Sequence, residues 1–101
     1  MVLIMVTAWI PPDKGTEVGK KYLEVMQKIP YESFEKPLVS AGNAVKDGMK
    51  VIEIFEVEKG KYEEALNLTV KRESEFFGIE GYRCEIETLL AVEEAMPMLG
   101  L

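Results

Sequence analysis

The chain has 101 residues, of which 48% are hydrophobic and 30% charged, and this is the composition of one compact globular domain. Its 12 Lys and Arg are outweighed by 18 Asp and Glu, and the net charge of −6 disfavours binding to nucleic acid or to an anionic membrane surface. It contains no His and a single Cys, which excludes haem ligation by His, an intrachain disulfide and a Cys-rich metal site, so we expect no metal and no cofactor.

Residues 2–10 form a continuous apolar run with β-branched and aromatic members, which predicts a strand buried on both faces. The run is half the length of about 20 residues that a bilayer requires. No basic residue precedes it, so we expect neither a membrane span nor a signal peptide. Pro11 and Pro12 end the strand, because proline cannot donate to a β-ladder.

The following segment has the spacing of an amphipathic helix that begins near Asp13 or Thr16 and ends at Pro30. Its apolar stripe consists of Val18, Tyr22, Val25, Met26 and Ile29. Residues 31–37 then form a connection.

Two strands follow, over residues 38–45 and residues 49–58. The first has small residues and Gly42, which indicate a bulge or a sheet edge. Asp47 and Gly48 lie between the two strands, and this pair is typical of a tight hairpin because the turn needs a positive φ.

The last part of the chain contains a second amphipathic helix over residues 62–77 and a strand over residues 82–92. A short tail, residues 93–101, ends the chain and is strongly apolar at Met96, Met98 and Leu99.

The element order is therefore β-α-β-β-α-β in one domain, residues 1–101. Right-handed crossovers then give an antiparallel four-stranded sheet of order 4-1-3-2 with two helices on one face. This α+β arrangement is the ferredoxin-like fold.

The second face of such a sheet needs a cover, because a monomer seldom exposes a large apolar patch. We therefore expect a homodimer in which two sheets face each other and the tail packs on the neighbouring subunit. The alternative is a tail that packs on its own subunit.

The chain resembles the dimeric α/β-barrel superfamily, and especially its small uncharacterised members. The resemblance covers almost the whole chain and rests on the element order, on a first strand that ends in Trp9-Ile10-Pro11-Pro12, and on the last strand with its Glu-Glu-Ala and apolar tail. It implies a barrel formed by two subunits. The superfamily includes cofactor-independent monooxygenases, small isomerases and ligand-sensing modules. Its haem-binding branches use a His that this chain lacks, and no catalytic motif of any branch is present.

Strand parity singles out a group of candidate ligand-binding residues. If Cys84 and Ile86 face the helices together with Ile52 and Ile54, four charged side chains point into the barrel interior: Glu53, Arg83, Glu85 and Glu87. Buried carboxylates can act as acid or base, and an Arg can bind an anionic or carbonyl group. Alternatively, these charges lie in solvent and pair with one another.

Trp9 completes the candidate set, because it ends the first strand and can stack on a planar ligand, although a lone Trp also fits a core or an interface.

The favoured function is binding of a small apolar or aromatic molecule in the barrel cavity. An alternative is a cofactor-independent monooxygenase or isomerase with a cavity glutamate as base, and a third is an assembly module. Whether the chain is an enzyme stays open. The lone Cys84 favours the cytoplasm.

Overall fold

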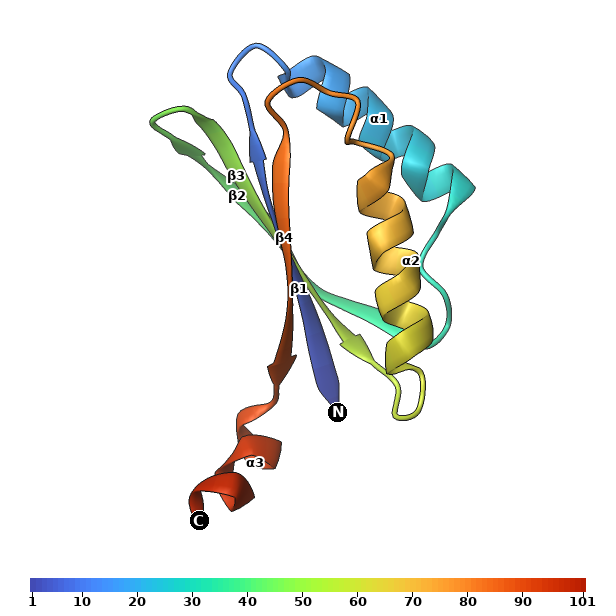
Figure 1. The fold of residues 1–101 in the computed structure, drawn as a ribbon, viewed down its shortest axis with the longest axis vertical. Helices are drawn as coiled ribbons and strands as arrows, with labels where there is room; N and C mark the ends of the chain where they lie inside the picture. Colours follow the sequence, from blue (N-terminus) through green and yellow to red (C-terminus); the bar gives the residue numbers. More distant parts are fainter.

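The computed structural model describes residues 1–101, and Figure 1 shows its sheet and helices. The strands are β1 (Val2–Ile10), β2 (Glu35–Val45), β3 (Gly48–Val57) and β4 (Arg83–Leu90). The helices are α1 (Gly15–Lys28), α2 (Tyr62–Ser74) and α3 (Val92–Ala95), and a 3-10 turn over Met96–Leu99 follows α3. None of the helices has the length and the apolar character needed to cross a membrane.

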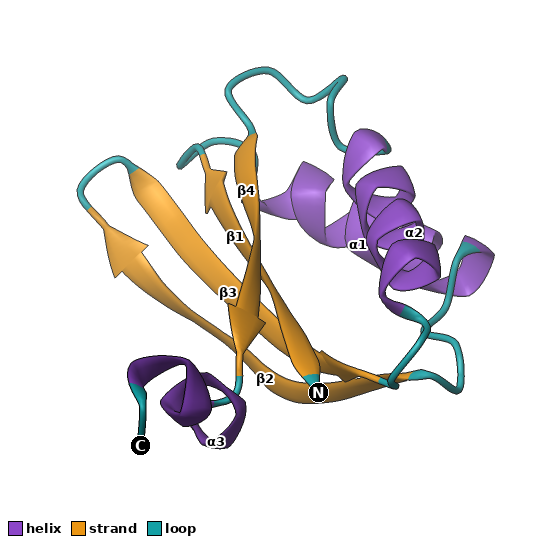
Figure 2. Cartoon of the chain, turned by 60° about the horizontal axis from the view of Figure 1, so that its bottom comes forward, coloured by secondary structure: helices purple, strands orange, loops and turns teal.

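The fold is α+β, with an antiparallel sheet of order β2-β3-β1-β4, which is the predicted order counted from the other edge. The predicted fold class is nevertheless wrong in its helices. The sequence predicted two helices and a short tail, whereas residues 92–99 form a third helix and a 3-10 turn. Within the single chain the sheet is open, with β2 and β4 as its edge strands (Figure 2).

The central strand β1 directs its even-numbered side chains toward α1 and α2, which lie on the same side of the sheet (Figure 2). Ile4, Val6, Ala8 and Ile10 are all buried there. The odd-numbered residues point to the opposite side, which we call the open face. Of these, Thr7 is buried and its neighbours are half-buried, so the predicted burial of both faces is only partly achieved within one chain.

The core beneath the helices consists of two clusters that share no buried residue. The first lies under α2 and consists of Ile4, Val6, Phe55, Val57 and Ala65. The second lies under α1 and consists of Ile10, Val18, Val25, Phe76 and Ile79. Between them, on the helix side of the sheet, Ala8 of β1 pairs with Val51 of β3 and with Cys84 of β4.

The hairpin between β2 and β3 follows the prediction. Gly48 has φ +134°, a backbone conformation that residues other than glycine rarely adopt. A Cβ at this position would also collide with the backbone carbonyl of Ile10. The hairpin therefore fixes the register of β3 against β1, and with it the face on which each β3 side chain lies.

Candidate functional site

A pocket of about 340 Å³ lies between α1 and the sheet. Twelve of its 18 lining residues are hydrophobic, which is the usual character of a small-molecule site. The apolar walls come from β1, α1, β3 and the segment that follows α2. They include Val6, Ala8, Ile10, Val18, Val25, Met26, Met49, Val51 and Phe76.

Two glycines of α1 border the pocket and leave it room. Gly15 and Gly19 are one helical turn apart, and a Cβ at either position would meet no atom within 4 Å. Gly19 lies in the interior of α1, where glycine costs roughly 1 kcal/mol relative to alanine. Here the two glycines remove side chains from the helix face that borders the pocket.

Two glutamates, each paired with a tyrosine, are the acidic residues of the pocket lining. The Tyr31 hydroxyl donates a hydrogen bond to Glu53 Oε2 at 3.2 Å. The Tyr82 hydroxyl donates to Glu73 Oε2 at 2.6 Å, and its ring stacks on Phe76. The glutamates come from β3 and α2, so they enter the pocket from different elements.

Both carboxyl groups are harder to ionise than an ordinary glutamate. Burial raises the pKa of Glu53, and the hydrogen bond from Tyr31 and the charge of Arg72 oppose that shift only in part. Burial also raises the pKa of Glu73, and the nearby charge of Glu53 adds to the effect. A carboxyl group with a raised pKa in an apolar pocket is a common feature of binding and catalytic sites.

The one cation among the lining residues, Arg72, is already engaged. Its Nη1 and Nη2 donate to the two oxygens of the buried Glu35 at 2.8 and 2.6 Å. Nε and Nη2 also donate to the carbonyls of Ile29 and Pro30. Its guanidinium group lies 4.8 Å from the centre of the Tyr31 ring, so Arg72 also holds that tyrosine in place.

Cys84 lies on the helix side of the sheet, as predicted, next to Ala8 in the register. Burial, and then the charge of Glu73, raise the pKa of its thiol to about 11, so the thiol is a poor nucleophile. No group of three or more His, Cys, Asp or Glu side chains is placed to share a metal ion.

Glu53 lies on the opposite side of the sheet from the predicted one. In the register it pairs with Val6, whose neighbour on β4 is Ile86, and these residues all face the helices. Ile52 and Ile54 therefore lie on the open face. The prediction assigned the more apolar residues of β3 to the helix side, but the hairpin register places them on the other.

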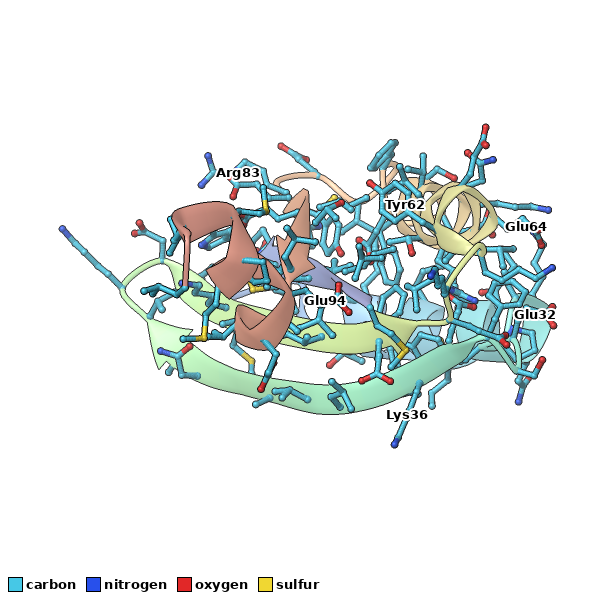
Figure 3. The ribbon with its side chains drawn as sticks, turned by 90° about the horizontal axis from the view of Figure 1, so that it is seen from below. Glu32, Lys36, Tyr62, Glu64, Arg83 and Glu94 are labelled. Carbon is cyan, nitrogen blue, oxygen red and sulfur yellow. The ribbon has the colours of Figure 1, made fainter.

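The other four predicted residues do not line this pocket. Trp9 and Arg83 border a separate, more polar hollow of about 380 Å³ at the end of β1, and their side chains are stacked 5.9 Å apart. Glu85 and Glu87 are exposed on the open face. Figure 3 shows Arg83 projecting from the opposite side of the sheet to Glu64 of α2. The five predicted residues thus do not form one site.

The sequence reasoning missed Glu73 and Arg72, although a signal for them was present. Both lie in phase with Ala65 and Thr69 on the buried stripe of α2, where charged residues are unusual unless they are paired. Tyr31 and Tyr82 lie in connections, and no local pattern indicated that their hydroxyls reach the glutamates.

No protein-family model matches the chain, and no curated protein matches it. Among solved structures it is similar to a de novo designed protein, Foldit4, with a TM-score of 0.58 and 14% sequence identity. The match covers 89% of this chain and 96% of that chain. At such low identity the likeness describes the fold alone.

Proposed function

We propose that this protein binds a small, mainly apolar molecule in the pocket between α1 and the sheet. The observation that supports this proposal is a pocket of about 340 Å³ with apolar walls and two convergent glutamates. A folded chain normally fills such space, because each unfilled volume in a core loses packing energy. The two glycines of α1 instead keep the volume open.

A blocked-pocket variant tests this proposal. Indole and 3-ethylindole are titrated into ¹⁵N-labelled protein, and we expect amide shifts centred on Val18, Gly19 and Val51, which border the pocket. Gly19→Leu should fill the pocket and abolish these shifts, while Gly78→Leu, at a position outside the pocket lining where an added Cβ meets no atom within 4 Å, should not. Shifts that survive in Gly19→Leu, or a complete lack of shifts in the unmodified chain, would contradict the proposal.

A second candidate function is proton transfer without a cofactor, as in an isomerase. It is supported by the raised pKa of both Glu53 and Glu73, since one carboxylate can remove a proton next to a carbonyl while a protonated neighbour hydrogen-bonds the enolate oxygen. The proton returns to the substrate from the same glutamate, so the net reaction moves a hydrogen and needs no oxidant.

Hydrogen exchange in the substrate separates catalysis from binding. Cyclic ketones such as 2-indanone are incubated with the protein in D₂O, and deuterium at the carbon next to the carbonyl is followed by NMR. We expect exchange above the buffer rate that is lost in Glu53→Gln. If a ketone binds but its hydrogens exchange only at the buffer rate, the catalytic function is contradicted and the binding function remains.

We also propose that two copies associate through their open faces. Only 17 of the 101 residues are buried, and the chain exposes 6749 Å² where a compact monomer of its mass exposes about 5,800 Å². Its radius of gyration is 14.9 Å against about 12.7 Å for a compact domain of this length. The extra exposed surface includes an apolar face of the sheet. Such a face is expected in a chain that associates with a partner.

Charge complementarity favours a second copy of this chain on that face. Lys50 and Arg83 lie beside Trp9 at one end of the strands, whereas Glu87 and Glu56 lie beside Met5 and Leu3 toward the other end. An antiparallel two-fold pairing places the basic end of one copy against the acidic end of its partner.

The cytoplasm is proposed as the location. The single, half-buried thiol of Cys84 forms no intrachain disulfide, and this fits a reducing compartment.

A further inference from the structure

The hydrogen-bonding capacity left over in the pocket indicates what kind of ligand it would accept. The oxygens Glu53 Oε2 and Glu73 Oε2 each accept one tyrosine hydroxyl. Each tyrosine hydroxyl donates its single O–H in that bond and has no second hydrogen to donate. The remaining carboxylate oxygens and both phenolic oxygens are acceptors. The two glutamate–tyrosine pairs therefore offer a ligand acceptors and no free donor, and the other hydroxyls in the lining are those of Tyr22 and Ser40.

The charges around the pocket do not balance. Arg72 is matched by Glu35, with which it forms a two-pronged ion pair, and four of its five N–H groups are already donated. No other lysine or arginine lines the pocket. Glu53 and Glu73 consequently bring up to two negative charges into a largely apolar space, and the charge of Arg72 offsets that of Glu53 only in part.

We propose, building on the binding function above, that the ligand is a primary or secondary amine with an apolar body, and that its ammonium group lies between Glu53 and Glu73. An ammonium group is a donor only and carries the missing positive charge. The walls formed by Val18, Val25 and Phe76 take up the apolar body, and the volume suits a one- or two-ring skeleton.

The surrounding groups fit this assignment. Facing the two glutamates are Tyr22 of α1, Tyr31, Tyr82, Arg72 of α2 and Cys84 of β4. The tyrosine hydroxyls and the thiol are neutral at pH 7.5, and the pKa of each is shifted upward by burial. None of them competes with an ammonium group as a cation, and the one competing cation is bound to Glu35.

Three probes with the same indole body test the inference by isothermal titration calorimetry at pH 7.5. Tryptamine carries an ammonium group, 3-ethylindole is its neutral counterpart, and indole-3-propionate is an anion. We expect tryptamine to bind at least about tenfold more tightly than 3-ethylindole, the gain of one charged hydrogen bond. We expect the anion to bind more weakly than either.

Variants show whether the glutamates are responsible. Glu53→Gln and Glu73→Gln keep the size of the side chain and the oxygen that accepts from tyrosine, so the fold should be retained, which circular dichroism checks. Each should lower the tryptamine affinity about tenfold and leave that of 3-ethylindole unchanged. Glu85→Gln, on the open face, is the matched control and should change neither.

The outcomes separate this inference from the binding function. Equal or tighter binding of 3-ethylindole overturns the amine assignment but leaves a pocket that binds apolar molecules. Tighter binding of indole-3-propionate also overturns it. If no probe binds the unmodified chain, both proposals fail. Preferential tryptamine binding that is insensitive to Glu53→Gln and Glu73→Gln overturns the assignment to this pocket.

Discussion

Glu53 and Glu73 are buried carboxyl groups that lower the stability of the fold. A carboxylate in an apolar environment costs free energy that a tyrosine hydroxyl only partly offsets. A glutamine would keep the hydrogen bond without the charge. Retaining two glutamates in the same pocket is therefore unfavourable for folding, which is the pattern expected when residues serve a site.

The stability of the folded chain depends on pH through Glu53. The pKa of Glu53 is raised in the folded chain above its usual value of 4.5, so between those two values the folded protein binds more protons than the unfolded one. The contribution of Glu53 to stability is therefore lost as pH rises through its folded-state pKa. A pKa that is higher by one in the folded chain corresponds to a loss of about 1.4 kcal/mol.

Glu53→Gln removes that loss, since a glutamine stays neutral. Urea denaturation should show the variant to be more stable than the unmodified chain at pH 8, with the difference shrinking toward pH 4.5. The exposed Glu85→Gln should stay within about 0.5 kcal/mol of the unmodified chain at pH 8. A Glu53→Gln variant less stable at pH 8 would contradict the proposed cost of burial.

At the scale of elements, Arg72 joins three segments. It lies on α2, binds Glu35 at the start of β2, and donates to the carbonyls that end α1. Because both partners are buried, removing one leaves the other charged and unpaired. The arrangement also holds Tyr31 where its hydroxyl reaches Glu53.

Arg72→Met should lower the free energy of unfolding by about 3–5 kcal/mol, as measured in urea, because Glu35 then loses its counter-ion. The double variant Arg72→Met/Glu35→Leu should recover much of that loss, since an apolar pair replaces a buried ion pair. No recovery in the double variant would show that the backbone carbonyl bonds, and not the ion pair, carry the effect.

The β2–β3 hairpin supports a prediction with an internal control. Gly48→Ala introduces a Cβ both at positive φ and into the carbonyl of Ile10, while Gly60→Ala introduces one at positive φ into open space. We expect about 1–3 kcal/mol of destabilisation from backbone strain at either site. Gly48→Ala should lower the free energy of unfolding, measured by heat or urea, clearly more than Gly60→Ala does. Equal losses would show that the collision with Ile10 is relieved at no cost.

Strand parity predicted one strand correctly and one incorrectly. On β4, Cys84 and Ile86 alternate with Glu85 and Glu87, so the polar and apolar faces were recognisable. On β3 both faces carry apolar side chains, and Ile52 and Ile54 are drawn to the open face by the hairpin register. A local pattern cannot rank two apolar faces, because burial depends on what packs against each one. The pocket was missed for the same reason.

At the scale of the whole molecule, the open face and the C-terminal segment are both incompletely covered. Leu99 and Leu101 are 75% and 78% exposed, and Figure 1 shows α3 beyond the end of β4, away from α1 and α2. The prediction treated residues 93–101 as a tail, yet a sequence of four helical residues and a 3-10 turn is too short to be recognised by periodicity.

The proposed antiparallel pairing predicts a charge-swap rescue. Arg83→Glu should weaken self-association in sedimentation velocity, because a like charge then faces Glu87 of the partner. Arg83→Glu/Glu87→Arg should restore it. Leu23→Lys, on the far side of α1 at a position 65% exposed, should have no effect. A monomer at all concentrations, or no rescue, would contradict the pairing.

The division of the core into two clusters has a dynamic consequence. β1 is the one element that contributes buried residues to both: Ile4 and Val6 to the first, Ile10 to the second. Loosening of α1 exposes only the cluster around Val18 and Val25, and the cluster around Phe55 stays closed. Such partial opening costs less than global unfolding. In the proposed binding function, a molecule would therefore enter and leave the pocket through local opening of α1, while the sheet continues to hold Glu53 in place.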